Sequence, residues 1–118
     1  MEDYAGIDVL MGIGGAPEAV LAAAALKCVG GEIQCKIWPR DEQERERLKA
    51  DGIDINKVYR TDDLVRGNDV SFAATGITSG ELLNGVQYFG WGARTSSVMM
   101  RSRSGTIREI HARHKWRR

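Results

Sequence analysis

The stretch Gly12-Ile13-Gly14-Gly15-Ala16-Pro17-Glu18 is the best guide to the fold of this chain. It follows an apolar run at residues 7–11 and precedes the alanine-rich residues 19–26. This order is typical of a strand, a glycine turn and the start of a helix. Pro17 suits the first helical position because its missing N–H would have no partner there, and Glu18 lies where the helix dipole favours negative charge. The stretch therefore predicts a junction that presents backbone N–H groups and one carboxylate.

The glycines of this stretch are compatible with a ligand site. Gly14 and Gly15 can adopt backbone angles that other residues avoid, and they leave room for a ligand beside the main chain, as phosphate-binding turns require. The spacing differs from known nucleotide loops, because no Gly-Lys-Ser/Thr follows and the third glycine of the dinucleotide motif is missing. Two interpretations stay open at this point: an anion or metal corner, or a tightly packed turn without a ligand.

The composition indicates one domain over residues 1–118. With 118 residues and 42% hydrophobic content, the chain can bury one core, and its length is near the commonest domain size. Its charge is unevenly distributed, because residues 1–93 carry 9 basic and 15 acidic side chains whereas residues 94–118 carry 8 basic and 1 acidic. The basic end, with a tail at 112–118, suits a nucleic acid, an anionic substrate or an acidic subunit.

The cysteines and the apolar runs indicate a cytoplasmic location. Cys28 and Cys35 have neither a redox spacing nor a zinc pattern, so we expect ordinary thiols. No apolar run is long enough to span a membrane, and the first residues lack the basic-then-apolar pattern of a signal peptide. We therefore expect a cytoplasmic protein without a membrane partner.

Predicted strands and helices alternate along the chain, which favours an α/β sheet with functional corners at the carboxyl ends of strands. Helices are predicted over residues 17–29 and 41–50, with one turn at 61–65 capped by Thr61 and a short helix at 79–83. Strands are predicted at residues 7–11, 32–38, 69–76, 86–89, 95–101 and 105–111.

Few side chains are candidates for catalysis. His111 and His114 lie in the basic end, where we expect solvated surface groups, and Ser96-Ser97 has no base nearby in the sequence. We therefore assign no catalytic residue from these patterns.

Several separated segments match one known family in the same order. They are GIGGAPE at 12–18, VLAAAALK at 20–27, DDLVRG at 62–67, FAATG at 72–76 and MRSRSGT at 100–106. Together they resemble the C-terminal part of the class II fructose-1,6-bisphosphatases, whose cyanobacterial members also act on sedoheptulose 1,7-bisphosphate. The resemblance covers roughly residues 6–111.

The resemblance implies a layered α/β/α architecture with a central mixed sheet, hydrolysis of the 1-phosphate of a sugar bisphosphate, Mg²⁺ or Mn²⁺, and a homo-oligomer. It also implies that Glu18 is a metal ligand, because Glu18 matches the glutamate of the family's Gly-Gly-Ala-Pro-Glu motif. Gly14 and Gly15 are then candidates for phosphate binding at the same corner. Ala19 replaces the glycine that usually follows this glutamate, a change that a helix tolerates.

The other metal carboxylates of the family, and its Asp-Arg-Pro-Arg-His and Asp-Gly-Asp substrate segments, have no counterpart in these 118 residues. One carboxylate cannot assemble a site that uses two or three metal ions. We therefore expect a detached C-terminal domain that is inactive alone, contributes Glu18, and needs an N-terminal half of the parent enzyme before a sugar bisphosphate can bind.

Two alternatives stay open. The chain is either a self-associating scaffold or regulatory module that kept the fold without the chemistry, or a protein that binds nucleic acid through its basic tail. We rank nucleic acid last, because Trp116 is the only aromatic residue of the tail and single-strand binding normally uses several aromatic side chains.

Overall fold

The computed structural model describes residues 8–80 and 82–116. Its longest helix is α1 (Ala16–Val29), which begins where the glycine stretch ends. Gly15 is the residue before the first turn, with an extended backbone (φ −72°, ψ 160°), and Gly30 ends the helix in the left-handed conformation at φ 78°. The helix predicted over residues 17–29 is confirmed, because both of its ends are encoded locally by proline and glycine.

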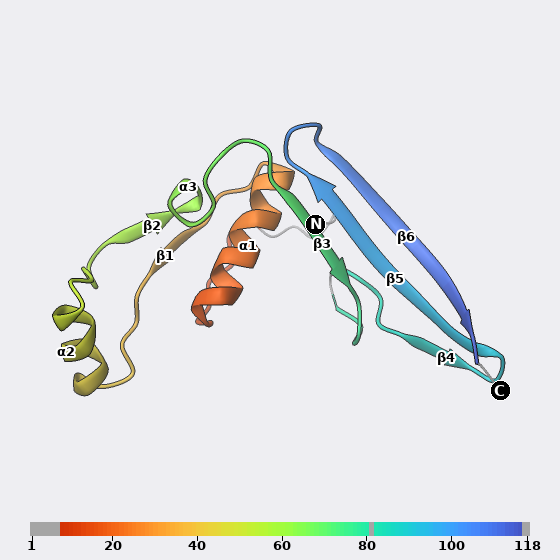
Figure 1. Ribbon diagram of the computed structural model, residues 1–118, viewed down its shortest axis with the longest axis horizontal. Coiled ribbons are helices and arrows are strands. Elements are labelled where there is room, and N and C mark those ends of the chain that lie inside the picture. Colours follow the sequence, from red (N-terminus) through yellow and green to blue (C-terminus); the bar gives the residue numbers. More distant parts are fainter. Residues whose placement is uncertain (1–7, 81, 117–118) are drawn as a thin grey trace.

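The main sheet is built around one long strand. It contains β3 (Ser71–Thr75), β4 (Gln87–Phe89), β5 (Gly92–Arg101) and β6 (Thr106–Lys115), and every pairing between them is antiparallel. β6 runs along the whole of β5, whereas β3 and β4 pair with opposite ends of β5 and share its other edge (Figure 1). The sheet therefore consists largely of one long hairpin with two short strands added.

A small core lies between α1 and this sheet. Cys28 of α1 packs against Val98 and Met100 of β5, which are only 3% and 5% exposed. Alternate residues of a strand point to opposite faces, so Met99, between these two, points away from α1. Partly buried side chains surround this cluster: Val70, Phe72, Ala74 and Leu83. Helix α1 therefore covers part of one face of the sheet, over β3 and the adjoining end of β5.

A second, smaller unit lies on the other side of α1 (Figure 1). It contains β1 (Gln34–Lys36), α2 (Glu42–Ala50), β2 (Val58–Arg60) and α3 (Thr61–Leu64), and β1 pairs with β2 in antiparallel fashion. Asp41 caps α2, because its Oδ1 accepts a hydrogen bond from the backbone N–H of Glu44 at 2.8 Å. Lys27 of α1 binds the smaller unit through Asp62, with Nζ 2.7 Å from the carboxylate.

The overall shape is open. The radius of gyration is 18.2 Å, whereas a compact domain of this length has a value of about 13.5 Å. The accessible surface is 9898 Å², whereas a folded monomer of 13.0 kDa normally exposes about 6,300 Å². The chain by itself therefore leaves much of its surface without the packing that a finished domain has.

The structure confirms the α/β class, and it differs from the expectations in detail. The resemblance implied a mixed sheet in an α/β/α arrangement, whereas all ladders among the described strands are antiparallel and α1 covers part of one face of the main sheet. Residues 112–115 of the predicted basic tail extend β6, because the pairing with β5 continues as far as Lys115. Among the described residues, no helix has the length and apolar character needed to cross a bilayer.

Two predicted elements are wrong. Residues 8–11 form no strand, because no described strand lies beside them to pair with, and Ile7 of the same prediction lies outside the described residues. Residues 79, 80, 82 and 83 are not helical, and Glu81 lies outside the described residues. This loop is instead closed by Ser79, whose Oγ accepts a hydrogen bond from Gly85 N at 3.0 Å, and by Val86 N donating to Ile77 O at 3.1 Å.

Candidate functional site

The predicted corner lies at the N-terminus of α1. Glu18 is in the first turn and exposed, and Gly15 O accepts the first helical hydrogen bond from Ala19 N at 3.1 Å. The Glu18 side chain folds back over Gly15, with its Cδ 3.2 Å from the position that a Cβ on residue 15 would take. A larger residue at position 15 would require the Glu18 side chain to move aside. Space is open around Gly14, where an added Cβ would meet no atom within 4 Å.

The corner supplies only part of a metal site. Glu18 takes part in none of the ion pairs between described residues, so its carboxylate is available to a cation. Residues 8–80 and 82–116 contain no group of three or more His, Cys, Asp or Glu side chains that could hold a metal ion. Divalent cations at phosphatase centres need several oxygen ligands together. The described residues therefore do not form a complete Mg²⁺ or Mn²⁺ site, and the roles of Gly14, Gly15 and Glu18 remain predictions.

The segment that leads into this corner exposes large apolar side chains. Their exposed fractions are 75% for Val9, 90% for Leu10, 89% for Met11 and 83% for Ile13. An apolar run of this kind is suited to a buried strand, and here it has no neighbouring strand among the described residues. The surface around Glu18 is therefore one that additional polypeptide can cover.

A hydroxyl and an imidazole meet on the sheet, which the sequence did not predict. Ser96 Oγ lies 3.2 Å from His111 Nδ1, because the β5–β6 register places the two residues directly opposite each other. They line a hollow of about 240 Å³ with Asn84 and Glu109. Their separation in the chain concealed the pair, and only the predicted hairpin between residues 95–101 and 105–111 could have indicated it. His114 Nε2 lies 3.0 Å from Thr95 Oγ1, a diagonal neighbour across the same two strands.

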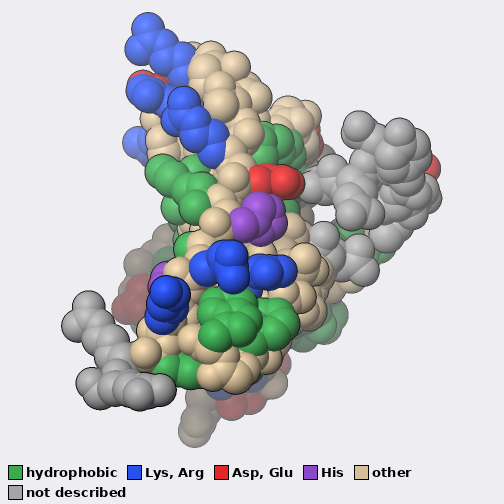
Figure 2. All heavy atoms as spheres, turned by 90° about the vertical axis from the view of Figure 1, so that its right-hand side faces the viewer, with side chains coloured by type: hydrophobic (Ala, Val, Ile, Leu, Met, Phe, Trp, Pro, Cys, Tyr) green, Lys and Arg blue, Asp and Glu red, His purple; other side chains and the backbone are tan. Residues whose placement is uncertain are grey.

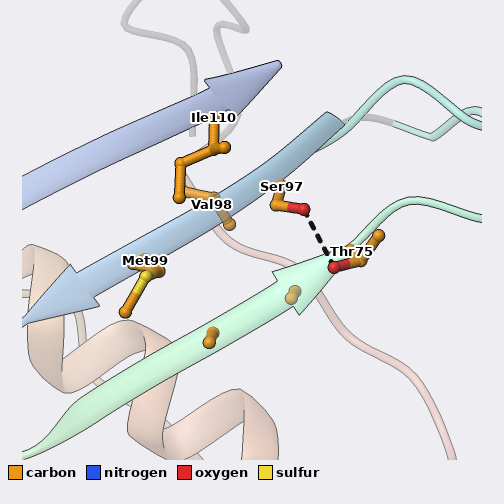
Figure 3. Close-up of a pocket in the computed structure, with 7 residues that line it drawn as sticks. Thr75, Ser97, Val98, Met99 and Ile110 are labelled. Carbon is orange, nitrogen blue, oxygen red and sulfur yellow. Dashed lines mark hydrogen bonds between the residues drawn. The ribbon is translucent and has the colours of Figure 1, made fainter. Parts of the chain in front are cut away.

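The face of the main sheet that points away from α1 carries small and apolar side chains. This outer sheet face consists of Ala73, Thr75, Ser97, Met99 and Ile110, and a hollow of about 320 Å³ lies over it. Figure 3 shows Met99 and Ile110 at the hollow and the hydrogen bond between Thr75 Oγ1 and Ser97 Oγ, which is 2.9 Å long. Met99 and Ile110 are 49% and 43% exposed. The outer sheet face thus resembles a packing surface more than a catalytic cleft.

Comparison with known protein families identifies the chain. The family described as bacterial fructose-1,6-bisphosphatase, glpX-encoded, matches residues 1–114. This chain belongs to that family. The resemblance found in the glycine stretch and the later segments is therefore confirmed.

The relatives that match this chain are fructose-1,6-bisphosphatases considerably longer than the chain. Fructose-1,6-bisphosphatase 2 class 2 of Escherichia coli (strain K12) is 42% identical over 120 residues, which cover 91% of this chain and 37% of the relative. Two proteins named D-fructose 1,6-bisphosphatase class 2/sedoheptulose 1,7-bisphosphatase, from Synechococcus sp. strains JA-3-3Ab and JA-2-3B'a(2-13), are each 43% identical over 122 residues. Those alignments cover 92% of this chain and 35% of each relative. The chain therefore spans little more than a third of the length of these family members.

Proposed function

We propose that this chain supplies one carboxylate corner and an assembly surface to a class II fructose-1,6-bisphosphatase site, and that it is inactive alone. The observation that carries the proposal is Glu18, an exposed carboxylate in the first turn of α1 beside open backbone at Gly14. The remaining ligands and the groups that bind a sugar bisphosphate would come from polypeptide corresponding to the part of the relatives that this chain does not match.

The role of Glu18 follows from its charge and position. Its carboxylate would hold Mg²⁺ or Mn²⁺ only together with further oxygen ligands, because one carboxylate binds such ions weakly. In a complete site such an ion would polarise the phosphate and lower the pKa of a bound water. The backbone N–H groups at the start of α1 favour a nearby anion, which suits a phosphate approaching Gly14 and Gly15.

The assembly surface is supported by three uncovered regions. They are the apolar residues before α1, the outer sheet face, and the outward side of α1, where Val20 and Leu21 are 42% and 58% exposed. Contiguous apolar patches of this kind mark interaction sites on soluble proteins. We propose that they contact the rest of the enzyme, and that copies of this chain associate when that partner is missing. A cytoplasmic location is part of the same proposal.

The proposal is tested by complementation. Phosphate release from fructose 1,6-bisphosphate is measured with Mg²⁺ or Mn²⁺ for the chain alone, and for the chain mixed with the part of the Escherichia coli relative that it does not match. We expect release only from the mixture, and its loss with Glu18→Gln. The matched control is Glu46→Gln on the exposed surface of α2, which should leave release unchanged.

Stability separates a role in the site from a role in folding. Glu18→Gln should change the free energy of unfolding by less than about 1 kcal/mol, the size of one exposed helix-dipole interaction. Release by the chain alone that disappears with Glu18→Ala would contradict the proposal, as would a complemented activity that is insensitive to Glu18→Gln. The alternative function, a self-associating scaffold, would be favoured if the chain formed stable oligomers and showed no affinity for the added part.

A further inference from the structure

The fold gathers four aromatic side chains at the end of the main sheet where β6 terminates. This aromatic tip consists of Tyr88, Phe89, Trp91 and Trp116, from β4, the turn after it, and the residue that follows β6. Tyr88 and Trp116 have nearly parallel rings with centroids 6.3 Å apart, and Phe89 and Trp91 form a second stack at 5.1 Å. Three of the four rings lie far from Trp116 in the sequence and are brought to it by the antiparallel pairing of β4, β5 and β6.

The tip is held in place and yet exposed. Trp116 donates a hydrogen bond from Nε1 to Phe89 O at 3.1 Å and another from its backbone N to Trp91 O at 3.3 Å. The exposed fractions are 73% for Tyr88, 40% for Phe89, 38% for Trp91 and 54% for Trp116. None of these rings is buried, so packing of a core among the described residues does not explain their clustering.

The charged side chains of the described strand segments that carry the aromatic tip are all positive. The guanidinium of Arg94 lies 5.4 Å from the centroid of Phe89, and that of Arg113 lies 4.7 Å from the centroid of Trp91. Lys115 is opposite Gly92 in the same part of the sheet. Segments 86–95 and 110–116 contain no Asp or Glu. Figure 2 faces this end of the molecule and shows Lys and Arg side chains directly beside a hydrophobic cluster.

We propose that the aromatic tip and its three cations form a binding site for single-stranded nucleic acid. Unpaired bases stack on exposed aromatic rings and on guanidinium planes, and phosphates are attracted by lysine and arginine. The sequence alone ranked nucleic acid last because the tail carries a single aromatic residue, Trp116. The structure supplies the missing aromatic residues from β4 and the turn after it.

A competing occupant is an acidic protein surface. Helix α2 has Glu42, Glu44 and Glu46 within its first turns, and on a second copy it could meet the cations of the tip. Attraction of that kind needs the positive charges and does not need four exposed rings. The rings therefore favour bases over a purely acidic partner, and the test is designed to separate the two.

The test uses the full chain and a fluorescein-labelled oligouridylate of about twelve nucleotides, followed by fluorescence anisotropy. We expect the oligouridylate to bind. A plot of the logarithm of the association constant against the logarithm of salt concentration should have a slope of about −2, the value for three cations on a single strand. Trp116→Ala and Arg113→Ala should each weaken binding by about tenfold, the size of one lost stacking or phosphate contact. Trp116→Phe should retain most of the affinity, because it keeps a flat ring.

Matched controls come from the smaller unit. Trp38 is 75% exposed after β1, and Lys57 lies 4.8 Å from the ring of Tyr59, so Trp38→Ala and Lys57→Ala remove the same kinds of side chain elsewhere. Both should leave the affinity unchanged. Circular dichroism of each variant checks that the fold is retained. Tyr88→Ala, which removes the most exposed ring of the tip, decides the outcome if Trp116→Ala does not fold, because a site that uses stacking must lose affinity in that variant.

Three results would overturn the inference. One is the absence of oligouridylate binding at low salt. Another is that heparin binds as tightly as oligouridylate and that Trp116→Ala does not weaken oligouridylate binding. That result would show that the patch is recognised by charge alone. The third is self-association that Trp116→Ala abolishes in a chain that binds no oligouridylate, which would show a protein interface. Phosphatase complementation is measured separately, so failure of this inference is distinguishable from failure of the proposed function.

Discussion

At the scale of single residues, Thr61 is the buried polar group with the most to lose. The residue is 4% exposed. Its Oγ1 donates a hydrogen bond to Glu32 Oε2 at 2.7 Å and accepts one from Ile33 N at 3.0 Å. Thr61→Val should therefore lower the free energy of unfolding by about 1–3 kcal/mol, because it leaves the half-buried N–H of Ile33 without its partner. Urea unfolding measures this, with Thr78→Val in the exposed loop as the control. Equal losses in the two variants would contradict the assignment.

Asp69 makes stability depend on pH. Arg101 donates two hydrogen bonds to its carboxylate, at 3.1 and 3.2 Å, and these together with the positive charge hold the pKa of Asp69 below its usual 3.8. A carboxylate with a lowered pKa stabilises the fold above its unfolded pKa, and this stability is lost as the pH falls through the folded value. Asp69→Asn should therefore lower the Tm at pH 7. It should leave the Tm unchanged at about pH 2, which lies below the usual range of carboxylate titration.

Thermal unfolding at the two pH values, each with and without about 1 M NaCl, measures this effect. High salt should shrink the difference at pH 7, because the pair is exposed to solvent. A difference between wild type and Asp69→Asn that grows toward acid would reverse the sign and contradict the argument.

Residue-level prediction from sequence worked where the signal is local. The first-turn position of Glu18 and the turn at Gly15 follow from Pro17 and from the glycines beside it. The Ser96–His111 pair and the four rings of the aromatic tip could not be found this way, because their meeting depends on strand register. Thr61 shows the same limit. It was predicted to cap a helical turn, whereas Arg60 occupies the cap position and Thr61 binds Glu32 and Ile33.

At the scale of elements, the β5–β6 hairpin depends on a close approach at Gly92. A Cβ on residue 92 would lie 2.8 Å from the carbonyl carbon of His114 and 2.9 Å from Cα of Lys115. Gly92→Ala should therefore push the strands apart and destabilise the chain by about 1–3 kcal/mol, as overpacking normally does. Gly90→Ala is the matched control, because a Cβ there meets nothing within 4 Å. Indistinguishable Tm values for the two variants would contradict this packing.

Elements were predictable where their ends are encoded in the chain. Helix α1 has proline at its start and Gly30 after its end, and the charged helix predicted over residues 41–50 begins one residue later, after Asp41, which caps it. The strand predicted at residues 7–11 is absent over 8–11 because a strand requires a neighbour, and the helix predicted at 79–83 is replaced over its described residues by a loop that Ser79 and Gly85 close. Tertiary context overrides local pattern in both cases.

At the scale of the whole molecule, the open shape and the uncovered apolar regions have one explanation in our account. The surface near Glu18, the outer sheet face and the segment before α1 are the places where further polypeptide would pack. Without it, copies of the chain should cover these surfaces for one another, because large apolar patches rarely stay exposed on soluble monomers. The chain is therefore expected to self-associate when alone.

Sedimentation velocity tests this most directly, with the chain at tens of micromolar, alone and mixed with the part of the Escherichia coli relative that it does not match. We predict species heavier than the 13.0 kDa chain when it is alone, replaced in the mixture by a complex that contains both polypeptides. A single 13.0 kDa species that is unchanged by the added part would contradict the account, because the uncovered surfaces would then have no partner.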